Sequence, residues 1–101
     1  MDTKTLITDA KARFSHNAAK IQLKDKYASK LIVAEQSGLW KATPELIGFL
    51  ASSTGDTVIL VDNFENPVLV NRVALYDVLS KTYIDTMQLW HSEWKELESK
   101  R

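Results

Sequence analysis

Residues 71–97 read NRVALYDVLSKTYIDTMQLWHSEWKEL, and neither proline nor glycine occurs from Arg72 to the last residue. Asn71 is a favourable helix N-cap, and a three- to four-residue spacing of mainly apolar positions follows it. These positions are Val73, Tyr76, Leu79 or Ser80, Tyr83, Met87, Trp90, Trp94 and Leu97. The pattern predicts a C-terminal helix of about 27 residues, roughly 40 Å long. Part of such a helix should project from a domain of this size.

A second helical pattern occupies the first third of the chain. Its apolar positions are Ile7, Ala10, Phe14, Ala18, Ile21, Leu23, Tyr27, Leu31 and Ala34. We expect the N-cap at Asp2 or Thr3 and the end of the helical segment at Gly38. The apolar stripe changes face near residues 15–17, which are poor helix formers. One long helix and two shorter helices that meet at residues 15–17 both fit the pattern.

The middle of the chain contains a short helix and a pair of strands. Residues 39–42 are expected to be an extended connector that packs Leu39 or Trp40 inward. Thr43 and Pro44 supply an N-cap hydroxyl and a proline at the first helical position, and this helix should end at residues 52–55.

The region after the short helix is rich in β-branched residues, which favour strands. Residues 57–61 and 68–70 predict a β-hairpin, with Pro67 at the start of its second strand or on an edge. Together the elements predict an α+β fold in a single domain, residues 1–101. We expect the two long helices to pack together, with the hairpin and the short helix capping one end.

The formal net charge is zero, but charge is unevenly distributed. Residues 1–41 contain eight Lys or Arg and four Asp or Glu, whereas residues 42–101 contain five and nine. The two halves should attract each other, within one molecule or between two copies. There are no cysteines, and no apolar run approaches the roughly 18 residues of a membrane span. With no secretion signal at the first residues, we expect a cytoplasmic protein without a membrane partner.

Residues that would indicate catalysis are sparse, and we expect neither an enzyme nor a cofactor. His16 and His91 lie in different elements, outside any HExxH, GxSxG or phosphate-loop pattern. The loop of residues 62–66 concentrates oxygen ligands that would suit calcium. Asp and Asn are also the usual residues of turns, and the loop lacks the glycine and distant glutamate of an EF-hand. A turn without a metal is the favoured interpretation.

Aromatic residues on the C-terminal helix are the favoured binding site. Trp is enriched at interface hot spots, and a domain of 101 residues has little left to cover the last turns of that helix. The predicted partner-binding residues are Tyr83, Met87, Trp90, Trp94 and Leu97. The expected function is therefore a non-catalytic interaction or assembly module that binds a protein partner or a second copy of itself.

Nucleic-acid binding by the basic N-terminal helix is the alternative. The residues that would carry it are Lys11, Arg13, Lys20, Lys24, Lys26 and Lys30. Zero net charge and an acidic hairpin loop favour the protein partner over this alternative.

Three segments carry a family resemblance: LWKATPELI at residues 39–47, NPVLVNR at 66–72 and WHSEWKEL at 90–97. They resemble small uncharacterised proteins of T-even-type tailed bacteriophages. The resemblance implies a location in an infected bacterial cytoplasm or a virion, and an assembly or accessory role. It transfers no activity to individual residues.

Overall fold

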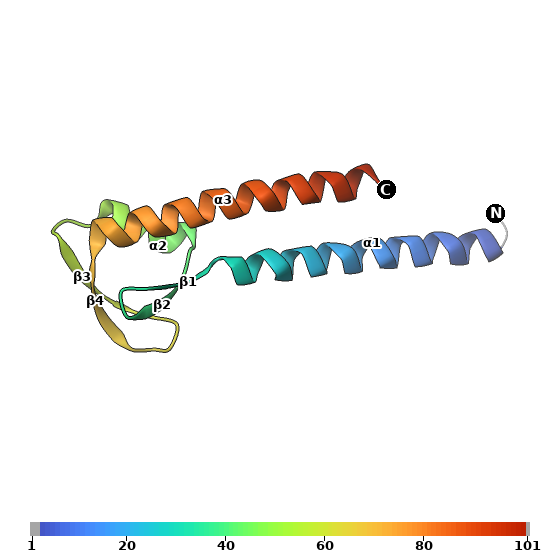
Figure 1. The fold of residues 1–101 in the computed structure, drawn as a ribbon. Coiled ribbons are helices and arrows are strands. Elements are labelled where there is room, and N and C mark those ends of the chain that lie inside the picture. The colour runs from blue at the N-terminus through green and yellow to red at the C-terminus, as the bar shows by residue number, and fades with distance from the viewer. Residues whose placement is uncertain (1–2, 101) are drawn as a thin grey trace.

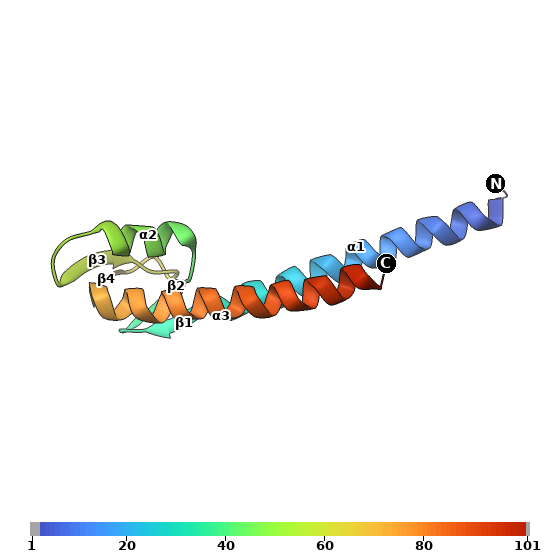
Figure 2. The same ribbon diagram turned by 90° about the horizontal axis from the view of Figure 1, so that it is seen from above.

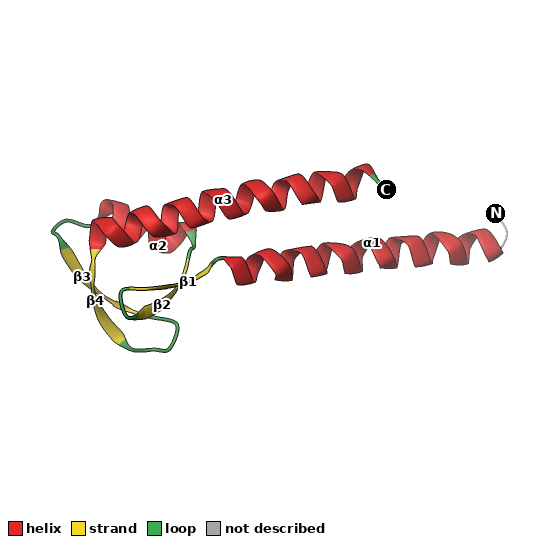
Figure 3. Cartoon of the chain, viewed as in Figure 1, coloured by secondary structure: helices red, strands yellow, loops and turns green. Residues whose placement is uncertain are grey.

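Two long antiparallel helices form a stalk, and two β-hairpins with a short helix form a head at one end of it (Figure 1, Figure 3). The computed structural model describes residues 3–100. The elements are α1 (Thr3–Lys30), β1 (Ile32–Glu35), β2 (Gly38–Lys41), α2 (Pro44–Ser52), β3 (Thr57–Val61), β4 (Pro67–Asn71) and α3 (Arg72–Ser99). The molecule is elongated, with extents of 66 × 24 × 19 Å. The predicted α+β class and the packing of the two long helices are confirmed.

α1 is one continuous helix, so the break considered near residues 15–17 does not occur. Its apolar stripe changes face because two sides of the same helix carry apolar residues. Ile21 and Leu23 are two residues apart, so they point in nearly opposite directions. Leu23 and Tyr27 face α3, whereas Phe14 and Ile21 are exposed to solvent. The N-cap predicted at residues 2–3 falls outside the side chains that the structure describes.

The first hairpin, β1–β2, was not predicted. The expected helix reached Gly38, but α1 ends at Lys30, and residues 32–41 pair as antiparallel strands. Leu31 and Ala34, which fitted the helical spacing, therefore lie outside the helix. The β-branched residues at 32 and 33 favour a strand, and pairing with β2 overrides the helical periodicity.

The tight turn of this hairpin carries no familiar sequence signal. Gln36 and Ser37 both have positive φ angles, 48° and 64°, a conformation in which Asn and Gly are usual. Gly38 was predicted to end the N-terminal helix, but the structure requires a glycine there for a different reason. A Cβ atom there would lie 2.5 Å from the Trp40 ring. Trp40 is buried, as predicted, and its Nε1 donates a hydrogen bond to the Glu35 carbonyl oxygen at 2.8 Å.

The remaining elements agree with the sequence prediction. α2 begins at Pro44, and the Thr43 hydroxyl accepts a hydrogen bond from the Leu46 amide at 3.2 Å. β3 and β4 pair in antiparallel register, and Pro67 is the first residue of β4. The Asn71 side chain caps α3 by accepting a hydrogen bond from the Ala74 amide at 2.9 Å. Local cap and turn chemistry therefore determines where these elements begin.

The hydrophobic core lies in the head, where α2, both hairpins and the first turns of α3 meet. Its buried members are Leu31, Trp40, Ala42, Leu50, Val70, Leu75 and Leu79. The stalk is held separately by contacts between α1 and α3 (Figure 2). Within residues 3–100, no helix has the length and apolar character needed to cross a membrane.

Candidate interaction surfaces

Packing within the stalk and head accounts for three of the five residues predicted to bind a partner. Tyr83 is half-buried against the head core. Trp90 is half-buried and stacks on Tyr27 of α1, with ring centroids 6.3 Å apart and planes 8° from parallel. Leu97 is half-buried and shares a hollow with Leu23 of α1. The predicted surface is therefore smaller in the folded chain than the helical spacing suggested.

The other two predicted residues, Met87 and Trp94, line a small apolar site together with Trp90 and His91, and we call these four residues the α3 patch. These four residues line a shallow cavity of about 220 Å³. Trp94 is 41% exposed, and its ring stacks with His91 at a centroid distance of 5.9 Å. An exposed indole beside an apolar cavity is the kind of feature that anchors a partner side chain.

The basic residues of α1 divide into two groups. Lys20 contacts Glu98 at 2.9 Å and Lys26 contacts Glu93 at 2.8 Å, so both are paired with α3. The second contact raises the pKa of Lys26 and lowers that of Glu93, because the hydrogen bond between them, and then their opposite charges, stabilise both charged forms. Lys30 lies 5.1 Å from the centre of the Tyr27 ring. The opposite charges of the two chain halves thus meet within one molecule.

The other group of basic residues faces solvent. Lys11, Arg13 and Lys24 are exposed, and none of them is in an ion pair among the side chains that the structure describes. Of the six positions proposed for nucleic acid, Lys20 and Lys26 are therefore paired with carboxylates of α3, and Lys11, Arg13 and Lys24 are not paired among the described side chains. Lys20 and Lys26 would have to leave their carboxylate partners to contact phosphate.

A second apolar surface, the outer face of the β3–β4 hairpin, was missed by the sequence analysis. Side chains of Val58, Leu60, Val68 and Val70 point into the head, and alternate residues point away from it. We call the outward set the outer sheet face: Thr57, Ile59, Val61, Pro67, Leu69 and Asn71. All six residues are exposed and none is charged. Ile59 lies directly opposite Leu69, and Val61 opposite Pro67.

The exposed fractions on this face are large for apolar residues. Ile59 is 66% exposed, Val61 68% and Leu69 65%. A hairpin with one solvated face normally alternates apolar and polar residues, whereas strands that are apolar at consecutive positions are usually covered on both faces. Residues 58–61 and 68–70 are consecutively apolar, which was the available sequence signal. It makes the outer sheet face a candidate binding surface.

A third apolar feature runs along the solvent side of α1. Ile7, Phe14 and Ile21 recur every seven residues, so they lie one above another on the helix. They are 51%, 77% and 60% exposed, and they lie opposite the side that packs on α3. We call these three residues the α1 stripe. Its residues were recognised from the sequence as helical, but no role was assigned to them.

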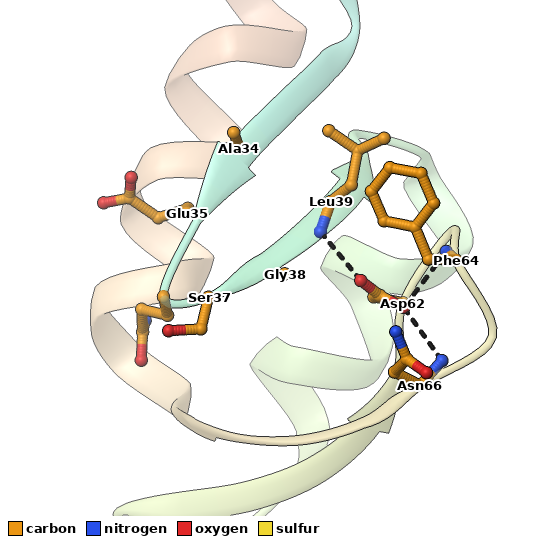
Figure 4. Close-up of a pocket in the computed structure, with 9 residues that line it drawn as sticks. Ala34, Glu35, Ser37, Gly38, Leu39, Asp62, Phe64 and Asn66 are labelled. Carbon is orange, nitrogen blue, oxygen red and sulfur yellow. Dashed lines mark hydrogen bonds between the residues drawn. The ribbon is translucent and has the colours of Figure 1, made fainter.

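The loop of residues 62–66 is a turn organised by one carboxylate (Figure 4). Asp62 is buried and accepts hydrogen bonds from the backbone amides of Asn66, Phe64 and Leu39 at 3.0, 3.0 and 3.1 Å. These donors, Asn66 first, hold the pKa of Asp62 below its ordinary value. Both carboxylate oxygens are occupied by the loop and by β2, which supports the predicted structural role.

The two histidines remain apart, one on each long helix. His16 Nε2 lies 3.2 Å from a Glu98 oxygen, and His91 stacks with Trp94. Among the residues that the structure describes, no three His, Cys, Asp or Glu side chains are grouped so as to hold a metal ion. Each histidine has a packing or ion-pairing contact that accounts for its position.

Comparison with known proteins identifies no relative: no protein-family model, curated protein or solved structure matches the chain significantly.

Proposed function

We propose that the chain is a non-catalytic protein-interaction or assembly module that docks a partner on its head. The outer sheet face is the observation that carries this proposal. Three aliphatic side chains, Ile59, Val61 and Leu69, are each about two-thirds exposed on one uncharged face. Large contiguous apolar patches on a protein surface mark interaction sites. A partner on this face would cover the second side of the hairpin, as expected for strands with consecutive apolar residues.

The architecture supports an adaptor role. The head has its own core, while the stalk is fastened by aromatic stacking and ion pairs between α1 and α3. Such a stalk would hold surfaces on the head and on the helices apart from one another. The α3 patch, with Trp94 as its exposed residue, would be a second contact for the same partner or for another one. The resemblance to small T-even-type phage proteins would place this assembly role in an infected cell or a virion.

Nucleic-acid binding ranks below this proposal. Four of its six candidate residues lie at or beyond Lys20 on α1, and two of these, Lys20 and Lys26, are engaged with Glu98 and Glu93. Any binding by the remaining cations would involve phosphate alone and would weaken steeply with salt.

Mass spectrometry of proteins retained by the tagged chain from its native source tests the proposal. Wild type should retain a defined protein, and the double variant Ile59→Lys, Leu69→Lys should lose it. Both residues face solvent, so the variant should keep its helical content and melting temperature. Retention that survives the double substitution, or that disappears on nuclease treatment, would argue against docking through the outer sheet face.

A further inference from the structure

The α1 stripe is an exposed apolar surface separate from the outer sheet face and the α3 patch. Ile7, Phe14 and Ile21 occupy the same position of three successive heptads, and Phe14 is 77% exposed. A coiled-coil seam repeats apolar residues at two positions of each heptad, a and d, and the α1 stripe supplies the a position of three heptads. Figure 2 shows α1 extending past the last turn of α3.

The charges beside the stripe indicate what kind of helix would cover it. Lys11 lies four residues after Ile7 and Lys24 lies three residues after Ile21, on opposite flanks of the stripe. Arg13 lies on the same flank as Lys24. Asp25, four residues after Ile21, is the acidic exception beside the stripe. The flanks are therefore predominantly basic, and Lys11, Arg13 and Lys24 have no ion-pair partner among the described side chains.

We propose that the α1 stripe binds an amphipathic helix of another protein, one with an apolar heptad seam flanked by Asp and Glu. Such a helix would insert its seam residues around Phe14 and place carboxylates next to Lys11 and Lys24. Interhelical ion pairs at the e and g positions, which Lys11 and Arg13 occupy when Ile7 and Phe14 are at a, set partner choice in coiled coils. Charge complementarity thus selects an acidic helix over a neutral one.

A second copy of the chain fits this face less well. An antiparallel pair with Phe14 on the two-fold axis would place Ile7 opposite Ile21 of the other copy, but it would also bring the two Arg13 residues together. A parallel pair would place Lys24 beside its own counterpart, because a residue three after Ile21 lies at the seam of such a pair. Like charges at these positions oppose association.

An anionic membrane surface also fits less well. Interfacial helices present a broad apolar face with about three to four apolar residues per two turns, and this face enters the headgroup region. The α1 stripe has one large apolar residue every two turns, with Ala10 and Ala18 between them and Asp25 beside it. A narrow seam of this kind suits another helix.

The test uses the full chain and two labelled synthetic peptides of four heptads, with Ile and Leu in the seam and either Glu or Lys on both flanks. Fluorescence anisotropy should show binding of the Glu peptide that weakens as salt is added, and no binding of the Lys peptide. Phe14→Ser should weaken binding by about tenfold or more. The double variant Lys11→Glu, Lys24→Glu should reverse the preference and bind the Lys peptide.

Leu89→Ser is the matched control, because Leu89 is a 54% exposed apolar residue on the other stalk helix. It should bind like wild type, as should Leu69→Lys and Trp94→Ala, so the outcome is independent of the other two surfaces. The proposal is overturned if the Glu peptide does not bind at about 100 µM, or if both peptides bind equally. It is also overturned if Phe14→Ser instead abolishes a dimer in sedimentation, or binding to vesicles of phosphatidylcholine with phosphatidylglycerol.

Discussion

Tyr27 and Trp90 stack across the stalk, with ring centroids 6.3 Å apart and planes 8° from parallel. Tyr27 is 1% exposed, which makes it the most buried side chain of α1 among those described. Its hydrogen bond with Glu93 raises the pKa of Tyr27. The same Glu93 carboxylate pairs with Lys26, so aromatic stacking and the ion pair reinforce one another at this point. This cluster joins α1 to α3 just outside the head.

Trp90→Ala should separate the helices of the stalk. Trp90 is half-buried, so loss of its contact with Tyr27 should lower the free energy of unfolding by about 2–3 kcal/mol. Trp90→Phe keeps an aromatic ring, so its free energy of unfolding should fall by less. Thermal unfolding followed by circular dichroism measures both variants. An alanine variant as stable as wild type would show that the stack does not hold the stalk together.

Trp94→Ala should behave differently, although Trp94 lies only four residues further along α3. Its ring is 41% exposed and contacts His91 on its own helix. We expect a change in unfolding free energy within about 1 kcal/mol. The same unfolding experiment, run on the monomeric protein, checks this. A large fall in melting temperature would make Trp94 a structural residue and would remove it from the α3 patch.

Stability should decrease in acid because the stalk carboxylates have lowered pKa values. Lys20 lowers the pKa of Glu98, and Lys26 lowers that of Glu93. A carboxylate whose pKa is lowered in the folded state stabilises the fold at pH values above its ordinary pKa, which is 4.5 for Glu. This stabilisation disappears as the pH falls through the folded-state pKa.

Melting temperatures between about pH 7 and pH 3 measure this dependence. The double variant Glu93→Gln, Glu98→Gln should have a lower melting temperature than wild type at neutral pH. Its melting temperature should fall less than that of wild type on acidification. Asp85→Asn removes an exposed carboxylate that pairs only with Lys81 of the same helix among the described contacts, and it serves as the control. Identical acid sensitivity of the double variant and wild type would contradict the role assigned to these pairs.

Two glycines should respond to alanine with opposite signs. A Cβ on Gly38 would lie 2.5 Å from the buried Trp40 ring, so Gly38→Ala should destabilise the head by about 1–3 kcal/mol. Gly48, within α2, has open space around its Cβ position, and Gly48→Ala should stabilise by about 0.5–1 kcal/mol through helix propensity. Urea unfolding of both variants measures the difference. A stable Gly38→Ala variant would mean that Trp40 has room to move.

Elements with a local chemical signal could be predicted from the sequence. Thr43 and Pro44 mark the start of α2, Asn71 marks the start of α3, and both caps form their hydrogen bonds. β1–β2 could not be predicted, because its turn residues, Gln36 and Ser37, adopt positive φ without the usual Asn or Gly. The need for Gly38 comes from Trp40 folding back over it, which is a tertiary contact without a local signature.

The candidate surfaces were only partly predictable. Helical spacing placed Trp90 and Trp94 on one helix, but it could not tell that Tyr27 would cover Trp90 and leave Trp94 exposed. The outer sheet face depends on which side of the β3–β4 hairpin the core covers. Because each strand has consecutive apolar residues, the sequence could not tell which face of the hairpin packs on the core. The position of the hairpin in the head shows which face is buried.

Photo-crosslinking from Leu69 tests docking through the outer sheet face most directly. A photoreactive residue replaces Leu69 in one sample and Leu89 in another, since both are exposed leucines, 65% and 54%, on different parts of the molecule. After irradiation in the native source, we expect a discrete adduct with another polypeptide from position 69 and none from position 89. No adduct at position 69, or equal adducts at both positions, would contradict the proposal that the head docks a protein partner.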